Sequence, residues 1–417
     1  MDDESLINFQ TFLKSRHGKR KTAFSYEELL QETPNMNMEE SENHMIQNVL
    51  SVVGVLSEKE RKSRGPNRNR ELKKIQWDDL YRRRNRDEEE FIEKFRIKRE
   101  TFDLLLDSLY DDLLLTPTNF LRNPTSPDRQ LAATLYRLAH GVTYNVLEDV
   151  FGISKEAGCS FFNKTVRLIV SHFYDEYVKL PETDEEWESE LRDFIENYGF
   201  PTVGAWDGFH VHVNSLEKSN YSFKKKYTIN NLALTSYNKR FLYAAVGAPG
   251  STHDARMLRE CSLFDEVLNG GVIPDRKFTL GDYGAIPLVT IGDSAFPRFS
   301  WLIKAYNEST RDPQKRYFNK MLCSARVVSE NTYGMLKGRW RFLCKKAETD
   351  PKHLRPIIMA CIALHNICIA KCDPCKPRWQ LEVQELDLIE GSLIREQRPA
   401  QSDLNRLKIS NWLWMNH

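Results

Sequence analysis

Four short acidic motifs follow one another in the C-terminal half of the sequence, and carboxylates are the side chains that Mg²⁺ ions need. Mg²⁺ takes hard oxygen ligands and commonly uses only one or two carboxylates per ion. Two ions held in this way can activate water and stabilise the leaving oxygen of a phosphodiester. No single motif is specific for this chemistry, but the ordered set predicts a two-metal nuclease site. The motifs are Ala-Trp-Asp-Gly-Phe-His around Asp207, Gly-Ser-Thr-His-Asp ending at Asp254, Gly-Asp-Ser-Ala-Phe-Pro around Asp293 and Ser-Glu-Asn-Thr-Tyr-Gly around Glu330.

Asp207 and Asp293 are the two acids whose positions most favour metal binding. Asp207 interrupts an otherwise apolar face of a strand predicted over residues 202–213, and a buried lone carboxylate is costly unless it pairs or binds a metal. A metal is favoured there over a Lys or Arg partner. Asp293 follows a short apolar strand predicted over residues 288–292, where open α/β sheets bind ligands. Its alternative is an ordinary turn aspartate.

Asp254 and Glu330 have plainer alternatives. Ser251 and Asp254 have the spacing of a capping box, so Asp254 can simply support the start of a helix. Glu330 shares a predicted helix with Lys337 and Arg341, and a solvated charged face is the usual explanation of such a Glu.

Basic residues follow Glu330 closely and stand among aromatic ones. Lys337, Arg339 and Arg341 beside a candidate metal site suit a phosphate backbone. The alternative is that their long side chains cover the apolar surface of a helix.

The composition bounds the class of protein. A chain of 417 residues with a net charge of +1 is long enough for more than one domain. We find no run of about 18 apolar residues, so no transmembrane helix is expected. The acidic start at residues 1–4 argues against secretion, and eight scattered cysteines fit a reduced compartment. The spacing of His365, Cys368, Cys372 and Cys375 would allow a structural zinc site. The alternative is that these cysteines are buried or loose thiols.

The first part of the chain is polar, and we predict that residues 1–87 form a disordered, basic arm. Residues 61–86 contain eleven basic and three acidic residues, a net charge of +8. Such a block is typical of a nuclear-localisation signal or a phosphate-binding arm, and equally of a solvated linker.

Residues 88–178 are predicted to form a small helical domain. Ser126-Pro127 starts one helix, Gly141 ends it, a short helix covers residues 144–151, and Ser154 caps a third. This pattern is typical of a helix-turn-helix module and also of a plain helical bundle. In the former, the last helix would present Lys155, Asn163, Lys164 and Arg167 to DNA.

Residues 179–370 predict an α/β domain with the acids at strand ends and on a helix. Strands are expected over residues 202–213, 227–237, 241–248 and 288–292, and helices over 251–268, 298–310, around Glu330, and 353–369. Residues 371–417 are left as a C-terminal tail.

The motifs resemble the PIF/Harbinger transposases and the nucleases derived from them, over residues 91–369. Spread in this order over one chain, the matching pieces are quite specific. They are Phe95-Arg96, Thr101-Phe102, Leu135-Tyr136-Arg137-Leu138-Ala139, Phe151-Gly152-Ile153-Ser154, Phe200-Pro201, Asp207-Gly208, Pro249-Gly250-Ser251-Thr252-His253-Asp254, Gly292-Asp293-Ser294, Arg326, Glu330, Tyr333-Gly334, Leu336-Lys337, Arg339-Trp340 and Leu364-His365-Asn366.

The resemblance implies an RNase H-like mixed sheet flanked by helices, preceded by the helix-turn-helix-like domain. It also implies a DDE-type site for Mg²⁺ or Mn²⁺ at Asp207, Asp254, Asp293 and Glu330. By strand topology we take Asp207, Asp293 and Glu330 as the catalytic core, with Asp254 as a fourth contributor. The resemblance implies a nuclear location for this chain, with an additional cytoplasmic location left open. Similar families also work with a separate Myb/SANT-like DNA-binding partner. A homo-oligomer is left open, and no membrane is expected.

Three residues depart from the family pattern: Trp206, Phe209 and Ser329. None removes an acid, so the site looks intact. The sequence therefore predicts a metal-dependent DNA endonuclease or transposase. The alternatives are a domesticated, non-catalytic DNA- or chromatin-binding adaptor on the same fold, and an RNA-directed ribonuclease.

Overall fold

The computed structural model describes residues 88–416, except for residues 118–123, 215–216, 223–225, 269–276, 280–281, 283, 298, 346–350 and 389–403. All described residues belong to one compact unit within Arg68–His417. The predicted N-terminal arm, with its basic block at residues 61–86, lies outside the described residues.

Five helices open the described chain: α5 (Glu88–Phe95), α6 (Arg99–Leu113), α7 (Pro127–His140), α8 (Tyr144–Phe151) and α9 (Lys155–Tyr177). Ser126 and Pro127 begin α7 as predicted, and Gly141 ends it in the left-handed conformation that glycine adopts readily. Gly152 ends α8 in the same way, and the Ser154 hydroxyl accepts a hydrogen bond from the Ala157 amide to cap α9. The three helix boundaries around these glycines are therefore confirmed.

A five-stranded mixed sheet follows α10 (Asp184–Tyr198). Its strand order is β3-β2-β1-β6-β7, with β1 (Ala205–His212), β2 (Thr228–Thr235), β3 (Phe241–Pro249), β6 (Thr290–Ile291) and β7 (Leu302–Ile303). The first three strands are antiparallel neighbours, whereas β1, β6 and β7 run parallel. A small second sheet pairs β4 (Lys277–Thr279) with β5 (Ala285–Pro287). The predicted mixed α/β sheet is confirmed.

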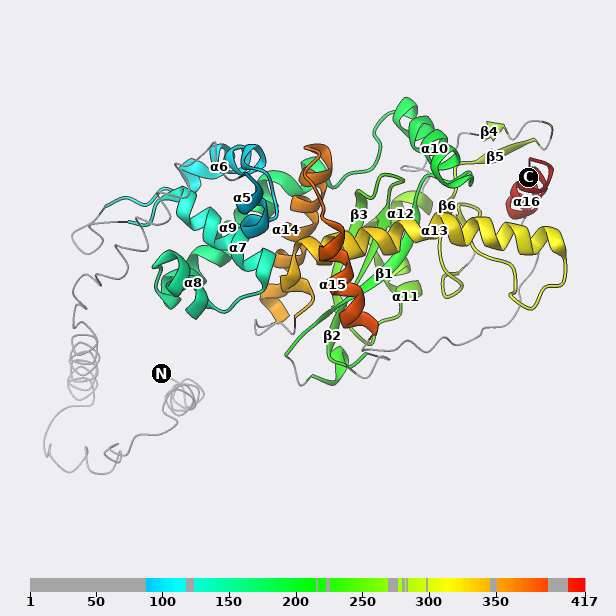
Figure 1. The fold of residues 1–417 in the computed structure, drawn as a ribbon. Coiled ribbons are helices and arrows are strands. Elements are labelled where there is room, and N and C mark those ends of the chain that lie inside the picture. The colour runs from blue at the N-terminus through cyan, green and yellow to red at the C-terminus, as the bar shows by residue number, and fades with distance from the viewer. Residues whose placement is uncertain are drawn as a thin grey trace, which may run out of the picture. The chain divides into compact units, whose positions relative to one another are not determined.

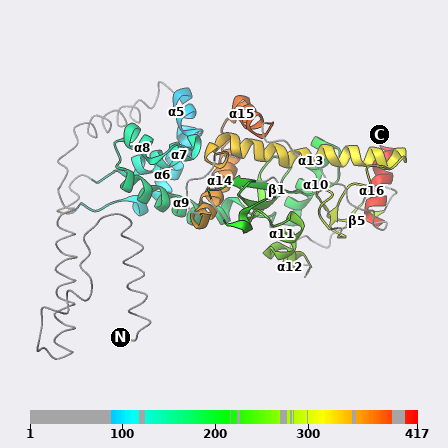
Figure 2. The ribbon, with the colours of Figure 1, turned by 90° about the horizontal axis from the view of Figure 1, so that it is seen from below.

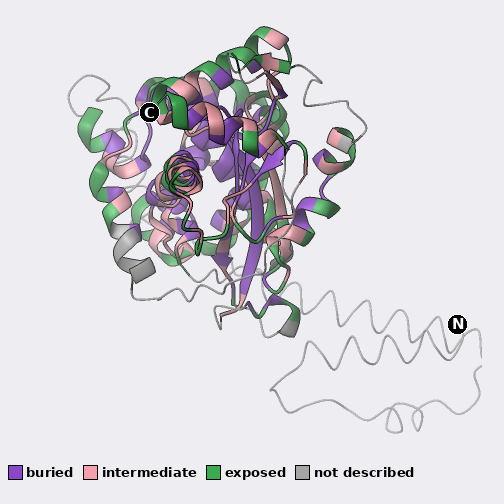
Figure 3. Cartoon of the chain, turned by 90° about the vertical axis from the view of Figure 1, so that its right-hand side faces the viewer, coloured by how far each residue is buried: buried purple, intermediate pink, exposed green. Residues whose placement is uncertain are grey.

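Helices cover both faces of the sheet. The long helix α13 (Pro313–Arg339) lies on one face, and α11 (Asp254–Glu260) and α12 (Ser262–Leu268) lie on the other (Figure 2). Alternation along β1 explains this, because Ala205 packs with residues of α13 while its neighbour Trp206 packs with residues of α11. Every residue of β2 is buried, so the sheet is the dry centre of this region (Figure 3).

One hydrophobic core joins the N-terminal helices to the sheet. It includes buried residues of α5 to α9, β1 to β3, α13 and α14 (Pro351–Ala370). Helix α14 packs against both α9 and β3 (Figure 1). The Asn366 side-chain amide donates to the backbone carbonyls of Tyr177 and Phe241, and its oxygen accepts from the Phe241 amide. The predicted domain boundary at residue 178 stays a prediction, and the core is continuous across it.

Two predicted helices differ in the structure. The helix expected over residues 251–268 is two helices, interrupted at Cys261. The segment 298–310 is not helical, because Leu302 and Ile303 form β7 and pair with Thr290 and Ile291. Burial of this short apolar run at the sheet edge outweighs its local helical pattern.

The predicted C-terminal tail contains two helices, α15 (Pro377–Leu388) and α16 (Leu404–Met415), and both pack on α13. Trp379 of α15 is almost wholly buried, as are Ile409 and Leu413 of α16. These helices therefore extend the core that supports α13.

The expectation about apolar runs needs one correction. Within the described part of the chain, His353–Ala370 is long and apolar enough to cross a membrane by length and composition, and 67% of it is buried inside the protein. A core helix meets the same criteria, so this stretch is weak evidence for a membrane span.

Candidate active site

The strand register brings Asp207 and Asp293 together. Strands β1 and β6 are parallel, with Ala205 opposite Ile291. Asp207 and Asp293 each stand two residues further along, so they emerge at the same edge and on the same side. Asp293 follows the end of β6, where its carboxylate accepts a hydrogen bond of 2.8 Å from the Ala295 amide. This is the hydrogen bond of an ordinary turn aspartate, which was the alternative interpretation of Asp293, and it lies beside Asp207.

Asp254 reaches the same place from the opposite face of the sheet. Its carboxylate lies directly over Gly208, where an added Cβ would come within 2.5 Å of the Asp254 Oδ2 atom. The buried Asn230 side chain donates a hydrogen bond of 2.7 Å to the Asp254 Oδ1 atom and another to the Thr252 carbonyl. Helix α11 begins at Asp254 with His253 as its N-cap, so the capping box expected with Ser251 is wrong.

Helix α13 is fixed against β1 by hydroxyl groups on one face. The Tyr333 hydroxyl donates a hydrogen bond of 2.7 Å to the Asp207 backbone carbonyl. One turn earlier, the Ser329 hydroxyl contacts the Ala205 carbonyl and the Thr235 hydroxyl. Ser329 is fully buried, which explains why a small polar residue stands there instead of an aliphatic one.

The electrostatic environment of Asp207 distinguishes it from a surface acid. The pKa of its carboxyl is raised from an ordinary 3.8 to about 7, chiefly by burial and also by the nearby Asp293 and Asp254. The Arg326 guanidinium and the Gly208 amide act in the opposite direction. Two acids thus act on Asp207, and Arg326 offsets part of their repulsion.

Glu330 occupies a different position from the one predicted. Its side chain is 62% exposed, and its carboxylate lies 3.8 Å from the guanidinium of Arg326, one helical turn earlier. Among the residues that the structure describes, no group of three or more His, Cys, Asp or Glu side chains is arranged to hold a metal ion. The described residues thus show no convergence of Asp207, Asp293 and Glu330, and the Glu330 carboxylate pairs with Arg326.

The chemistry of the aspartates nevertheless fits a divalent cation. Asp207, Asp254 and Asp293 offer hard carboxylate oxygens from three separate elements, as Mg²⁺ and Mn²⁺ prefer. A cation of charge two would favour the ionised form of Asp207 that burial now disfavours.

The predicted nucleic-acid contacts divide into two groups. Lys155, Lys164 and Arg167 are exposed on α9, as a DNA contact requires. Lys337 and Arg341 are half-buried at the end of α13 and just beyond it.

Arg339 was predicted to contact DNA, and this prediction is wrong. Its side chain is 1% exposed, and its guanidinium donates to the carbonyls of Arg96 and Asp373. It also lies over the Trp379 ring at 5.9 Å. Arg339 therefore joins α15 and the N-terminal helices to α13, and no nucleic acid can reach it.

The histidines and cysteines weighed in the sequence lie apart from this cluster. His365 is fully buried and its Nε2 atom is 2.8 Å from the Lys239 carbonyl. Cys368 is buried beside it in α14, whereas Cys372 is exposed. The described residues offer no zinc-binding group there. His210, by contrast, stands opposite Asn230 in the β1–β2 pairing, and its Nδ1 atom lies 2.9 Å from the Thr228 hydroxyl.

Sequence reasoning gave no role to three residues that the structure brings to the aspartates: Asn230, Arg326 and Tyr333. Arg326 and Tyr333 are spaced at seven residues around Glu330, which puts them near one face of a helix. That spacing was a usable signal. Asn230 had none, because only the packing of α11 on β2 brings it to Asp254.

Comparisons with known proteins support the same assignment. Residues 206–366 match the family model described as DDE superfamily endonuclease. Over 313 residues, the chain is 28% identical to Protein ALP1-like of Arabidopsis thaliana. The matched region is 71% of this chain and 75% of the relative. No solved structure matches. The family resemblance expected from the motifs is confirmed, in that residues 206–366 match a DDE superfamily endonuclease domain.

Proposed function

We propose that this chain is a nuclear DNA endonuclease of the DDE type that hydrolyses phosphodiester bonds with Mg²⁺ or Mn²⁺. The observation that carries the proposal is the position of Asp293 and Asp254 beside the half-buried Asp207, from the pairing of β1 with β6 and the contact of Asp254 with Gly208, inside the matched domain. Three antiparallel strands followed by two parallel ones, with helices on both faces, support an RNase H-like fold for this domain.

The aspartates would hold the cations, with Glu330 as a further ligand. When bound, such ions lower the pKa of water and stabilise the leaving 3′ oxygen. The chain's own residues hold this arrangement in place. Asn230 fixes the Asp254 carboxylate, and Tyr333 and Ser329 fix the β1 backbone that carries Asp207. To join the aspartates, Glu330 would have to exchange its ion pair with Arg326 for a bound cation, which would compete with the guanidinium for the carboxylate.

The proposed partners are DNA and a second protein. DNA would lie on the basic residues of α9 and those after Glu330. Target-site recognition would come from a separate Myb/SANT-like protein, and strand transfer by a freed 3′ hydroxyl would make the same site a transposase. A homo-oligomer is compatible with this scheme.

The test is cleavage of supercoiled plasmid by the full-length protein with Mg²⁺, Mn²⁺ or EDTA. Asp207→Ala removes a carboxylate from the centre of the cluster, so the cleavage rate should fall by far more than ~10²-fold while DNA affinity changes little. Asp107→Ala removes an exposed carboxylate of α6 and serves as the matched control. Wild-type cleavage by a folded Asp207→Ala protein would show that the assigned site is wrong.

One observation favours a second function. Glu330 is exposed and paired with Arg326, so the four acids do not form a closed set. A domesticated adaptor that binds DNA or chromatin without cleaving it would retain such an arrangement. Absence of cleavage with either metal, with and without a Myb/SANT-like partner, would favour the adaptor.

A further inference from the structure

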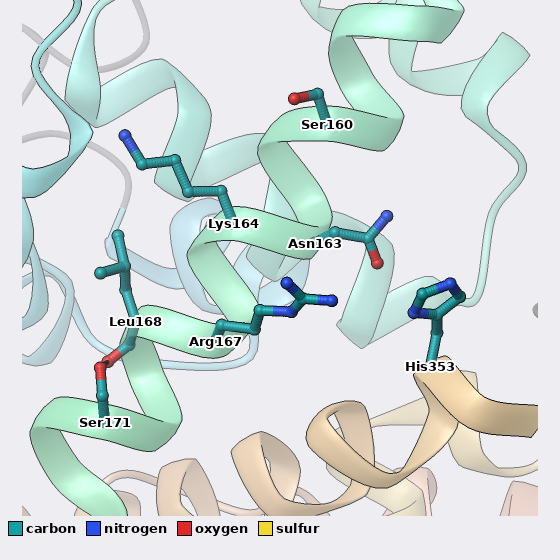
Figure 4. A pocket seen from close by; sticks show the side chains of 7 residues that line it. All are labelled: Ser160, Asn163, Lys164, Arg167, Leu168, Ser171 and His353. Carbon is teal, nitrogen blue, oxygen red and sulfur yellow. Dashed lines mark hydrogen bonds between the residues drawn. The ribbon is translucent and has the colours of Figure 1, made fainter.

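A polar groove lies between α9 and the first turn of α14, away from the aspartates. It encloses about 530 Å³ and is lined by Ser160, Asn163, Lys164, Arg167, Leu168, Ser171 and His353. Figure 4 shows Asn163 and Arg167 extending toward His353, while Lys164 extends to the other side of α9. The groove is therefore built from two segments that are far apart in the sequence.

The lining has one chemical character. Ser160, Lys164, Arg167 and Ser171 form a stripe at spacings of four, three and four residues along α9. The opposite face of the helix carries buried residues such as Phe162 and Ile169, so the stripe must face solvent. No acidic side chain is among the described lining residues. The groove thus presents two fixed positive charges, an imidazole, two hydroxyls and an amide.

The two cations have no protein partner in the described part of the chain. Neither Lys164 nor Arg167 forms an ion pair or a side-chain hydrogen bond there. This differs from Arg137, Arg339 and Arg96, which are engaged with carbonyls and aromatic rings in the core. Arginine presents a rigid fork of donors that matches phosphate oxygens, and lysine adds a point charge. The ligand that fits is a chain of anionic oxygens.

We propose that this groove binds the phosphodiester backbone of duplex DNA, with Arg167, Lys164 and His353 as its contacts. The proposal rests on the proposed function only for the choice of DNA as the polymer. The helix-turn-helix prediction also assigns Lys164 and Arg167 to DNA, but as residues that read base edges together with Lys155 and Asn163. Here the contacts lie in the middle of α9 and on α14, so they position the strand without reading its sequence.

The groove is also connected to the aspartates through the sheet. His353 belongs to the helix that carries Asn366, and Asn366 ties α9 to β3 through the Tyr177 and Phe241 carbonyls. β3 pairs with β2, whose Asn230 holds Asp254. A backbone held in the groove is thus held on the same rigid framework as the aspartates.

The experiment measures binding of the full-length protein to two labelled duplexes of unrelated sequence, by fluorescence anisotropy, in EDTA so that no cleavage is needed. Each of Arg167→Gln, Lys164→Gln and His353→Gln should weaken binding to both duplexes by the same factor. Arg167→Gln should reduce the slope of log K against log salt by about 1, as for one lost phosphate contact. Lys277→Gln removes an exposed charge on β4, outside the groove, and should change neither quantity.

Several outcomes would overturn the proposal. Wild-type affinity and slope in the Arg167 and His353 variants would remove the groove as a site. A loss confined to one duplex sequence would indicate base reading. Displacement of DNA by millimolar sodium phosphate, but not by chloride of equal ionic strength, would make free phosphate the ligand. A loss confined to an RNA of the same length would exclude DNA.

The failure of this proposal is distinguishable from that of the nuclease. If wild-type protein cleaves nothing while Arg167→Gln weakens binding, the groove stands and the nuclease proposal fails. If Asp207→Ala abolishes cleavage while the groove variants bind and cleave normally, the groove proposal fails alone. Thermal melts of each variant confirm folding, since exposed polar side chains such as these contribute little to stability.

Discussion

At the scale of single residues, Asp207 shows how a strand can carry a reactive acid. It stands on the apolar face of β1 between Ala205 and Phe209, where Tyr333 binds its backbone carbonyl and the Gly208 amide donates to its carboxylate. Tyr333 uses its hydroxyl for the Asp207 carbonyl, while its ring packs on Phe209 at 4.9 Å. The carboxylate is left to interact with charge, which a cation would supply.

This arrangement predicts a pH-dependent stability in metal-free solution. The pKa of Asp207 is raised to about 7 in the folded protein from an ordinary 3.8, so its stabilising contribution is complete below about pH 4 and is lost as the pH rises through 7. Asp207→Asn is neutral throughout. It should therefore raise the free energy of unfolding at pH 8, on the order of 2 kcal/mol after allowance for solvent, and much less at pH 5.

The measurement is denaturant unfolding in EDTA at both pH values, with Asp107→Asn as the control. A variant less stable than wild type at pH 8 would contradict the raised pKa of Asp207. Added Mg²⁺ should stabilise the wild type and leave the Asp207→Asn protein nearly unchanged.

Gly208 offers a second prediction at this scale. An added Cβ would lie within 2.5 Å of the Asp254 carboxylate, which is short, fixed by Asn230 and unable to move cheaply. Gly208→Ala should displace Asp254 and lower the cleavage rate by more than ~10-fold, since metals supply several kcal/mol to the reaction. Plasmid cleavage checks this, and wild-type rates would mean that Asp254 takes no part.

At the scale of elements, α13 is the support on which the rest is placed. It lies along β1, receives α15 and α16 on its outer sides, and begins where Asp312 caps it and Pro313 occupies its first turn. The close approach of α15 depends on Gly338, whose missing side chain leaves room for the Trp379 carbonyl.

Two glycines of α13 therefore predict opposite effects. Gly338→Ala would place a Cβ 2.8 Å from the Trp379 carbonyl oxygen, and should cost about 1–3 kcal/mol of stability by overpacking. Gly334→Ala meets nothing within 4 Å and should stabilise the helix by up to ~1 kcal/mol. Denaturant unfolding of the two variants side by side is the measurement. Equal effects would contradict the packing of α15 on α13.

At the scale of the whole molecule, the helical segment and the sheet are joined by one core. Ile169 of α9, Phe241 of β3 and Ile358 of α14 are buried members of the same cluster. The compact unit within Arg68–His417 should therefore unfold in one cooperative transition that includes both regions.

Ile169→Ala tests this cooperativity. The truncation should cost about 2–5 kcal/mol. Amide hydrogen exchange should then show reduced protection in β2 as well as in α9, because both belong to one unfolding unit. Leu114→Ala, at a side chain 55% exposed, is the control. Loss of protection confined to α5–α9 would instead support a separate helical domain ending near residue 178.

The sequence by itself determined the elements whose signals are local. Ser126-Pro127, Gly141, Gly152 and Ser154 specify helix ends through their own backbone preferences, and the structure has those ends. Alternation placed Asp207 on the apolar face of a strand. The ordered acidic motifs indicated the DDE family, which the comparisons confirm.

Only the tertiary structure decided the features that depend on distant partners. Residues 298–310 have a helical pattern, yet Leu302 and Ile303 pair with β6 because the sheet edge buries them. Arg339 has the sequence context of a DNA contact, yet its guanidinium is enclosed by Arg96, Asp373 and Trp379. His353 joins the α9 groove. Arg339 donates to Arg96, 243 positions earlier in the sequence, and no local pattern carries such information.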